Sequence, residues 1–237
     1  MDEEKLVAVS SGTAHEVTKP SLLRRALGML WRFRFTISML TALRVAAWMT
    51  GTRFATITTG ALESLGVAPR DLWQLEIWRA LTSAVVTDGG AVFHLALLAV
   101  LAFVGSAEWL RGSLRTALTF WGVHLATLLI ESFLVALPLH LSGDPLGTAL
   151  VAARDVGPSA GYFGCLGLVL VSLPVTKRVR LALLGATFSA LVLALIIPLG
   201  ALVEEVRELS ANIAHMIALP LGALSSIIGR RRSSEPG

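Results

Sequence analysis

GPSAGYFG (residues 157–164) and ANIAH (residues 211–215) each open a long apolar stretch in the second half of the chain. The first segment contains Ser159 and the second contains His215. Burying a hydroxyl or an imidazole in lipid is costly, so polar groups within apolar stretches mark functional sites by default. The two segments therefore predict where the chain enters a membrane and which side chains to follow.

The composition indicates a membrane protein with one domain. Of 237 residues, 54% are hydrophobic and 15% are charged, against about 25% charged in soluble domains. We therefore predict an all-α polytopic membrane helical bundle. The N-terminal segment has no basic region before an apolar core, so we expect no cleaved signal peptide. Cys165 is the single cysteine, which excludes an intramolecular disulfide.

Hydropathy predicts six transmembrane helices, because a helix needs roughly 20 apolar residues to cross the hydrocarbon core. The first is the weakest, because Arg44 and Arg53 interrupt it and one of them is expected to reach back to an interface. The domain prediction is a cytoplasmic N-terminal tail (1–34), a six-helix membrane domain (35–229) and a basic cytoplasmic tail (230–237). The predicted spans are 36–60, 89–110, 116–138, 158–174, 180–200 and 212–228.

The distribution of basic residues predicts the orientation. Most of the 20 Lys and Arg residues fall in the two tails and in the turns near residues 111–115 and 175–180. Lys and Arg accumulate in cytoplasmic loops, so both termini are expected in the cytoplasm of a cell-membrane protein. The same pattern explains the net charge of +4 without a nucleic-acid partner.

This topology predicts that three polar groups share one depth near the outer face. Ser159 is expected in the first turn of a helix that starts near Pro158, and His215 in the first turn of one that starts near Asn212. His94 lies about one turn into the second span. A serine at a helix N-terminus lies beside unpaired N–H groups and the positive dipole end, which favour a developing oxyanion.

Small residues at intervals of four predict close helix packing around these groups, because small side chains let helix backbones approach in lipid. The repeats are Gly157, Gly161 and Cys165 on one helix and Ala214, Ala218 and Gly222 on the other.

The order of these elements resembles the rhomboid family of intramembrane serine proteases, over about residues 77–229. The resemblance rests on Trp-Arg in the first outer loop, a histidine followed by G…E…GS in the second helix, G-x-S with a later glycine, and A-N-x-A-H…G. In this sequence these positions are Trp78, Arg79, His94, Gly105, Glu108, Gly112, Ser113, Gly157, Ser159, Gly161, Gly164, Ala211, Asn212, Ala214, His215 and Gly222.

The resemblance implies a rhomboid-like fold and a catalytic pair, with Ser159 as nucleophile and His215 as general base. It also implies that Phe163 stacks on the His215 ring and that His94 and the Ser159 backbone form an oxyanion pocket. Leu98 stands where the family has an asparagine donor, and losing one such donor costs about 10²–10³ in turnover. Ala160 and Ala218 replace two further glycines of the family pattern.

Three functions remain open at this stage. The first is an intramembrane serine endopeptidase that cleaves transmembrane protein substrates near the outer face, with lateral entry beside the fifth span. The second is an inactive rhomboid-like protein that binds transmembrane clients, which Leu98 and Ala160 favour. The third is a transporter or channel, for which only Glu131 and His124 lie deep in a span.

Each polar residue also has a structural alternative. Ser159 could bond a backbone carbonyl, His124 a neighbouring helix, and Phe163 could simply pack in the core. The sequence has no cluster with metal-ligand spacing, so no metal or cofactor is expected, and the partners expected are the bilayer and transmembrane proteins.

Overall fold

The computed structural model describes residues 28–196 and 204–228 and is mostly helical (81%). In this part of the chain, strand-like pairing is limited to two isolated bridges, Thr56–Gly89 and Val67–Asp155. The elements are α2 (Arg34–Thr50), α3 (Thr59–Leu65), α4 (Pro69–Trp73), α5 (Trp78–Ser83), α6 (Gly90–Ala99), η1 (Val100–Val104), α7 (Gly105–Arg111), α8 (Ser113–Ile130), η2 (Glu131–Ala136), α9 (Leu137–Leu141), α10 (Pro145–Ala152), α11 (Ser159–Ser172), α12 (Lys177–Ile196) and α13 (Glu204–Ile228). The predicted tails fall largely outside the described residues.

Four helices are long and apolar enough to cross a membrane: Gly90–Arg111, Ser113–Leu141, Lys177–Ile196 and Val206–Ile227. The first two are continuous helices in which η1 and η2 are π-helical segments. A fifth apolar helix, Ser159–Ser172, is shorter. The prediction of an all-α bundle is therefore confirmed for the described residues, with four helices that could cross a membrane, while six transmembrane spans stay a prediction.

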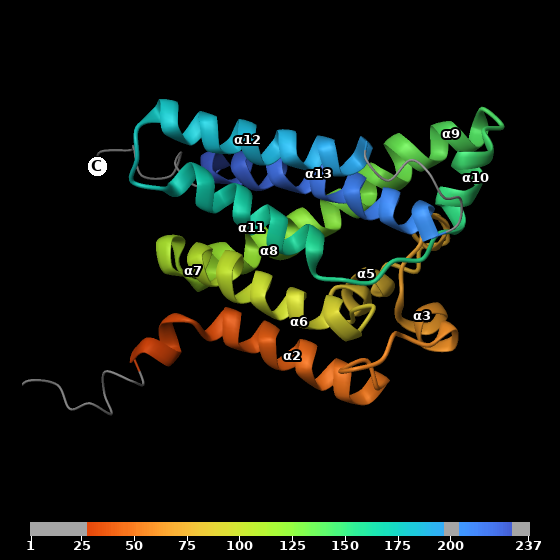
Figure 1. Cartoon of the computed structure of the whole chain (residues 1–237), viewed down its shortest axis with the longest axis horizontal. Helices are drawn as coiled ribbons and strands as arrows, with labels where there is room; N and C mark the ends of the chain where they lie inside the picture. The colour runs from red at the N-terminus through yellow and green to blue at the C-terminus, as the bar shows by residue number, and fades with distance from the viewer. Residues whose placement is uncertain (1–27, 197–203, 229–237) are drawn as a thin grey trace, which may run out of the picture.

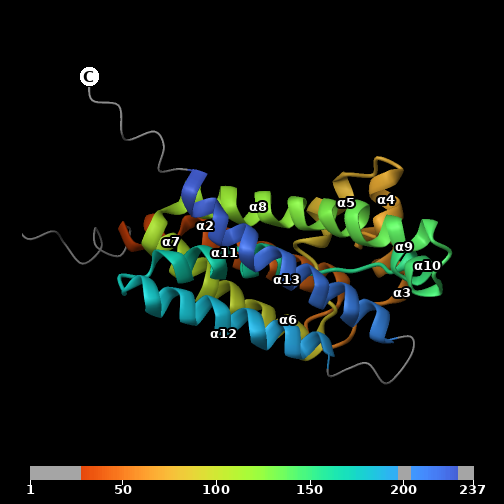
Figure 2. The ribbon, with the colours of Figure 1, turned by 90° about the horizontal axis from the view of Figure 1, so that it is seen from above.

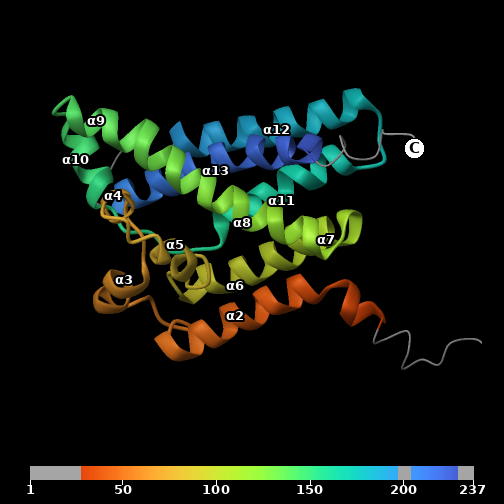
Figure 3. The same ribbon diagram turned by 180° about the vertical axis from the view of Figure 1, so that it is seen from behind.

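The long helices lie side by side, with α12 at one edge of the bundle, α2 at the other, and α13, α11 and α8 between them (Figure 1). Seen from above, α13 crosses diagonally between α8 and α12 (Figure 2). The short helices α3, α4, α5, α9 and α10 gather at one end of the bundle, as the view from behind also shows (Figure 3). We call this end the loop end.

The first helix is shorter than the predicted span 36–60. It ends at Thr50, because Gly51 adopts a left-handed conformation with φ 71°, a backbone region that glycine enters without steric cost. Arg53 therefore lies beyond the helix, with its guanidinium 4.9 Å from the centre of the Phe54 ring. Arg44 remains within the helix.

The N-terminal end of α2 is held by a buried carboxylate. Glu108 is 0% exposed and accepts hydrogen bonds from Phe35 N (2.9 Å), Thr36 N (2.8 Å) and Thr36 Oγ1 (2.6 Å). The first N–H groups of a helix have no partner within the helix. A negative charge at this end also interacts favourably with the positive end of the helix dipole. Glu108 thereby fastens α7 to α2.

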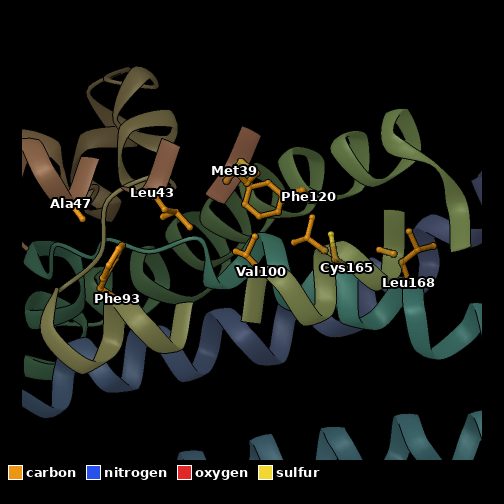
Figure 4. Packing of buried hydrophobic residues seen from close by; sticks show 10 residues of the cluster. Met39, Leu43, Ala47, Phe93, Val100, Phe120, Cys165 and Leu168 are labelled. Carbon is orange, nitrogen blue, oxygen red and sulfur yellow. The ribbon is translucent and has the colours of Figure 1, made fainter. Parts of the chain in front are cut away.

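The largest apolar cluster joins α2, α6, η1, α8 and α11 (Figure 4). The side chains labelled there include Met39 and Leu43 from α2, Val100 from η1, Phe120 from α8 and Cys165 from α11. Helix α11 is therefore packed in the interior of the bundle, and its first residue, Ser159, has a defined position.

Glycines set the spacing between α11 and its neighbours. A Cβ on Gly222 would lie 2.7 Å from the Cα of Gly164, and a Cβ on Gly167 would lie 2.8 Å from Ala223 N. Backbone thus meets backbone where α11 and α13 cross. Gly161 instead faces α8, since a Cβ there would lie 2.6 Å from Cζ of Phe120.

Helix α13 begins eight residues before the predicted start at 212. It starts at Glu204, so His215 lies about three turns into the helix, at 3.6 residues per turn. The prediction that His215 occupies a first turn was wrong. The apolar pattern marks only the part of the helix that can contact lipid, and the polar residues before it continue the same helix.

Candidate active site

The segment that leads into Ser159 is fastened to the loop end by backbone hydrogen bonds. Val67 and Asp155 pair in both directions, at 3.0 Å and 2.9 Å, and Gly157 N donates to Ser83 O at 2.8 Å. Gly157 has φ 151°, a conformation that a larger side chain rarely adopts. The chain then turns at Pro158 and enters α11 at Ser159.

Ion pairs reinforce this attachment. Arg154 donates to both carboxylate oxygens of Asp71, at 2.6 Å and 3.0 Å. Arg207 on α13 pairs with Asp88 and donates from Nε to the carbonyl of Arg154 at 3.0 Å. Bidentate arginine–carboxylate contacts fix orientation as well as distance. The loop before α6, the segment before α11 and the start of α13 are therefore held as one unit.

Ser159 lines a small enclosed pocket at the loop end. The cavity volume is about 20 Å³, which is enough for one water molecule. Ala160, Ser210 and Ala214 also line it, so α11 and α13 meet there. Its polar lining is Ser83, His124, Glu131, Ser132, Asp155, Ser159 and Ser210.

His215 stacks against Phe163, one turn after Ser159 on α11. The two ring centres are 4.3 Å apart and the planes are tilted by 32°. This is the contact that the sequence resemblance implies for these two residues. Asn212, one turn before His215, donates from Nδ2 to Ala194 O on α12 at 3.3 Å.

Ser159 and His215 thus lie at neighbouring levels of α11 and α13, but they are not hydrogen-bonded. The Nε2 atom of His215 is buried and has no hydrogen-bond partner in residues 28–196 and 204–228. Phe163 fixes the orientation of the His215 ring, and the Nε2 atom neither donates nor accepts a hydrogen bond within the described residues. The catalytic pair of Ser159 and His215 therefore stays a prediction. Its two residues lie on α11 and α13, the two helices that pack most closely.

The structure does not bring His94 to this pocket. His94 is exposed, and its Nδ1 atom lies 2.9 Å from Gly90 O of its own helix. It lines a separate groove between α2 and α6, and Leu98, which is 62% exposed, lines the same groove. The predicted oxyanion role of His94 therefore has no geometric basis here, and an asparagine at position 98 would face that groove too.

Two residues of the pocket were noticed in the sequence but not assigned to the site. His124 on α8 bonds from Nε2 to Ala80 O at 2.8 Å, and its Nδ1 is buried without a partner among the described residues. Glu131 accepts a hydrogen bond from Ser210. An ionisable side chain within an apolar span is a sequence signal that could have assigned both residues to the site. Their position at the pocket depends on the packing of the helix Ser113–Leu141 against α11.

The N–H groups at the start of α11 offer an alternative source of oxyanion donors. Pro158 precedes the helix and makes no side-chain cap hydrogen bond. The first N–H groups of a helix have no acceptor within the helix. Among the described residues, no side chain caps the N–H groups of Ser159, Ala160 and Gly161, which lie next to the Ser159 hydroxyl.

The remaining predicted residues have structural roles. Arg79 pairs with Glu76 and donates to the last carbonyls of α3, among them Glu63 O at 2.8 Å, and its guanidinium lies 4.7 Å from the Trp78 ring centre. Glu108 caps α2. Gly161, Gly164 and Gly222 are the close-packing positions described above.

Burial and the neighbouring Asp88 charge raise the pKa of Asp155 to about 6, against an ordinary value of 3.8. Asp155 lies four residues before Ser159, outside the apolar helices, and lines the pocket. The pKa of Asp155 therefore lies closer to neutral pH than that of an ordinary carboxyl group.

No group of three or more His, Cys, Asp or Glu side chains among the described residues is arranged to hold a metal ion. Comparison with protein-family models, curated proteins and solved structures finds no match to this chain. The function is therefore argued from the geometry of the site.

Proposed function

We propose that the chain is an intramembrane serine endopeptidase of rhomboid type, with Ser159 as nucleophile and His215 as general base. The observation that carries the proposal is the position of the His215 ring. It stacks on Phe163, one turn from Ser159, and its Nε2 atom is buried with no hydrogen-bond partner in the described part of the chain. A serine hydroxyl is a weak nucleophile until a base accepts its proton, and an uncommitted imidazole nitrogen is such a base.

The reaction follows from these positions. Ser159 Oγ attacks the scissile carbonyl carbon while its proton moves to His215 Nε2, and the carbonyl oxygen becomes an oxyanion. The uncapped N–H groups at the start of α11 donate to that oxyanion. His215 then protonates the leaving amine as the C–N bond breaks, and a water molecule hydrolyses the acyl-enzyme by the same steps.

The proposal places the loop end at the outer face of a cell membrane and both termini in the cytoplasm, following the distribution of Lys and Arg. Substrates are transmembrane proteins that enter laterally beside α12. In support of this path, no residue of α12 between Lys177 and Ile196 is buried. A helix with so little buried surface has little to hold it against displacement.

The test is covalent labelling with a fluorophosphonate, in which the activated serine oxygen displaces fluoride from phosphorus. We expect the purified wild-type protein to be labelled, and Ser159→Ala and His215→Ala to lose the label. Ser38→Ala is the matched control, because Ser38 is an exposed serine of α2 whose hydroxyl bonds Phe35 O at 2.8 Å. A folded wild-type protein that stays unlabelled would contradict the protease proposal.

The second candidate is a non-catalytic protein that binds transmembrane clients. Two observations favour it: Ser159 and His215 form no hydrogen bond, and His94 lines a separate groove and not the Ser159 pocket. It predicts no labelling in any variant, together with an intact thermal transition for the wild type.

A further inference from the structure

A continuous groove runs along the bundle between α2 and the helix Gly90–Arg111, away from the Ser159 pocket. It has two lobes with volumes of about 500 Å³ and about 690 Å³, each in the range of roughly 300–1,000 Å³ typical of ligand sites. The lobes share Ile37, Leu40 and Leu101. We call this feature the α2–α6 groove.

The two ends of the groove differ in polarity. The lobe nearer the loop end is lined by Arg44, Thr41 and His94 together with leucines. The other lobe is almost wholly apolar and ends at Trp109, whose ring stacks on Phe33 with 5.9 Å between centres. Within residues 28–196 and 204–228, no acidic side chain lines either lobe.

Arg44 is the charged group among the described residues that line this groove, and no described carboxylate pairs with it. Its guanidinium makes no hydrogen bond, ion pair or ring contact with the described residues, 28–196 and 204–228. Arg154 and Arg207, by contrast, are both paired with carboxylates. An unpaired arginine beside an apolar helix is costly in lipid and is expected to find an anion.

The length of the groove fits one lipid leaflet. From Arg44 to the start of α2 at Arg34 the helix rises about 15 Å, which is half of a hydrocarbon core about 30 Å thick. A long arginine side chain extends toward the interface while its stem stays in the apolar layer. Arg44 lies six residues, about 9 Å, before the end of α2 at Thr50, so its guanidinium extends toward the headgroup layer on that side. The apolar lobe runs from there toward the opposite end of α2.

We propose that the α2–α6 groove binds one anionic phospholipid, with its phosphate on Arg44 and an acyl chain along Leu40, Leu101 and Trp109. A guanidinium matches phosphate oxygens in a bidentate geometry that an ammonium does not offer. His94 closes the mouth, since its Nδ1 faces Gly90 O and leaves Nε2 for the headgroup. This site does not depend on the proposed protease activity.

The test is lipid binding to the purified full chain, measured by native mass spectrometry. The probes are phosphatidylglycerol and phosphatidylcholine with identical acyl chains, added to the protein in a non-ionic detergent. We expect the wild type to bind one phosphatidylglycerol at least tenfold more tightly than phosphatidylcholine. Arg44→Gln should reduce this preference to less than twofold, and Arg44→Lys should fall between them.

Two further variants separate the site from general charge effects. Arg53→Gln removes an exposed cation just outside the groove and should keep the wild-type preference. Thr41→Trp fills the lobe near Arg44 and should lower the affinity for both lipids. Equal binding of the two lipids by the wild type, or an unchanged preference in folded Arg44→Gln, would overturn the proposal.

Discussion

Replacing Gly222 by alanine tests the helix crossing that carries the site. A Cβ at position 222 would lie 2.5 Å from the carbonyl carbon and 2.7 Å from the Cα of Gly164, where real Cβ contacts are at least 3.0 Å. Both neighbours are backbone atoms of α11, so no side-chain rotation can relieve the clash. The two helices must separate or slide.

The expected magnitude follows from this geometry. Inserting a methyl group into a tightly packed region costs about 1–3 kcal/mol, and a clash with backbone belongs at the upper end of that range. The displacement also moves α13, and with it His215, relative to Ser159. Since a misplacement of about 1 Å can lower a rate about 100-fold, fluorophosphonate labelling should fall by about this factor under the proposed function.

The assay is unfolding in detergent, with Gly185→Ala as the matched control. Gly185 also lies in a helix, but nothing would lie within 4 Å of a Cβ there, and alanine stabilises a helix interior by about 0.5–1 kcal/mol relative to glycine. The two variants should therefore shift the unfolding midpoint in opposite directions. If Gly222→Ala is as stable as Gly185→Ala, the contact between α11 and α13 is not as described.

Three further predictions concern the loop end and the core. Glu108→Gln should lower the free energy of unfolding by about 1–3 kcal/mol, because the amide replaces a charged acceptor for the Thr36 N–H and hydroxyl; denaturant unfolding beside exposed Glu63→Gln measures this. The raised pKa of Asp155, about 6 against 3.8, means that the folded state holds this proton more tightly. Stability should therefore fall as pH rises from about 4 to about 6, by no more than about 3 kcal/mol, and Asp155→Asn should remove this dependence in pH-resolved unfolding. Gly161→Ala should destabilise the protein, because its Cβ would lie 2.6 Å from Cζ of Phe120, and Phe120→Leu should recover part of that loss in a double-mutant cycle; fully additive losses would contradict the contact.

Much of the helical organisation was predictable because it depends on local hydropathy. The predicted spans 89–110 and 116–138 correspond to the helices Gly90–Arg111 and Ser113–Leu141. The ends of the helices were less predictable where a backbone conformation or a polar helical turn decides them. The end of α2 at Gly51 and the start of α13 at Glu204 are the two examples.

The site was predictable in part. Small residues at intervals of four marked the tight approach of α13, at Ala218 and Gly222, and an aromatic one turn after Ser159 proved to stack on His215. The direction of each small residue was not predictable, since Gly161 packs on Phe120 of α8 while Gly164 meets Gly222 of α13. The position of His94 in the groove between α2 and α6 was not predictable for the same reason. Periodicity along one helix does not say which neighbouring helix each face contacts.

The sequence by itself predicted an all-α chain with helices long and apolar enough to cross a membrane, because a helix needs roughly 20 apolar residues to span the hydrocarbon core. It also placed Ser159 and His215 on two different apolar helices. Only the tertiary structure decided that His124, Glu131 and Asp155 join Ser159 at one pocket while His94 and Arg44 line another. Those neighbours come from helices distant in the chain, and their meeting depends on packing between faces, which no local pattern encodes.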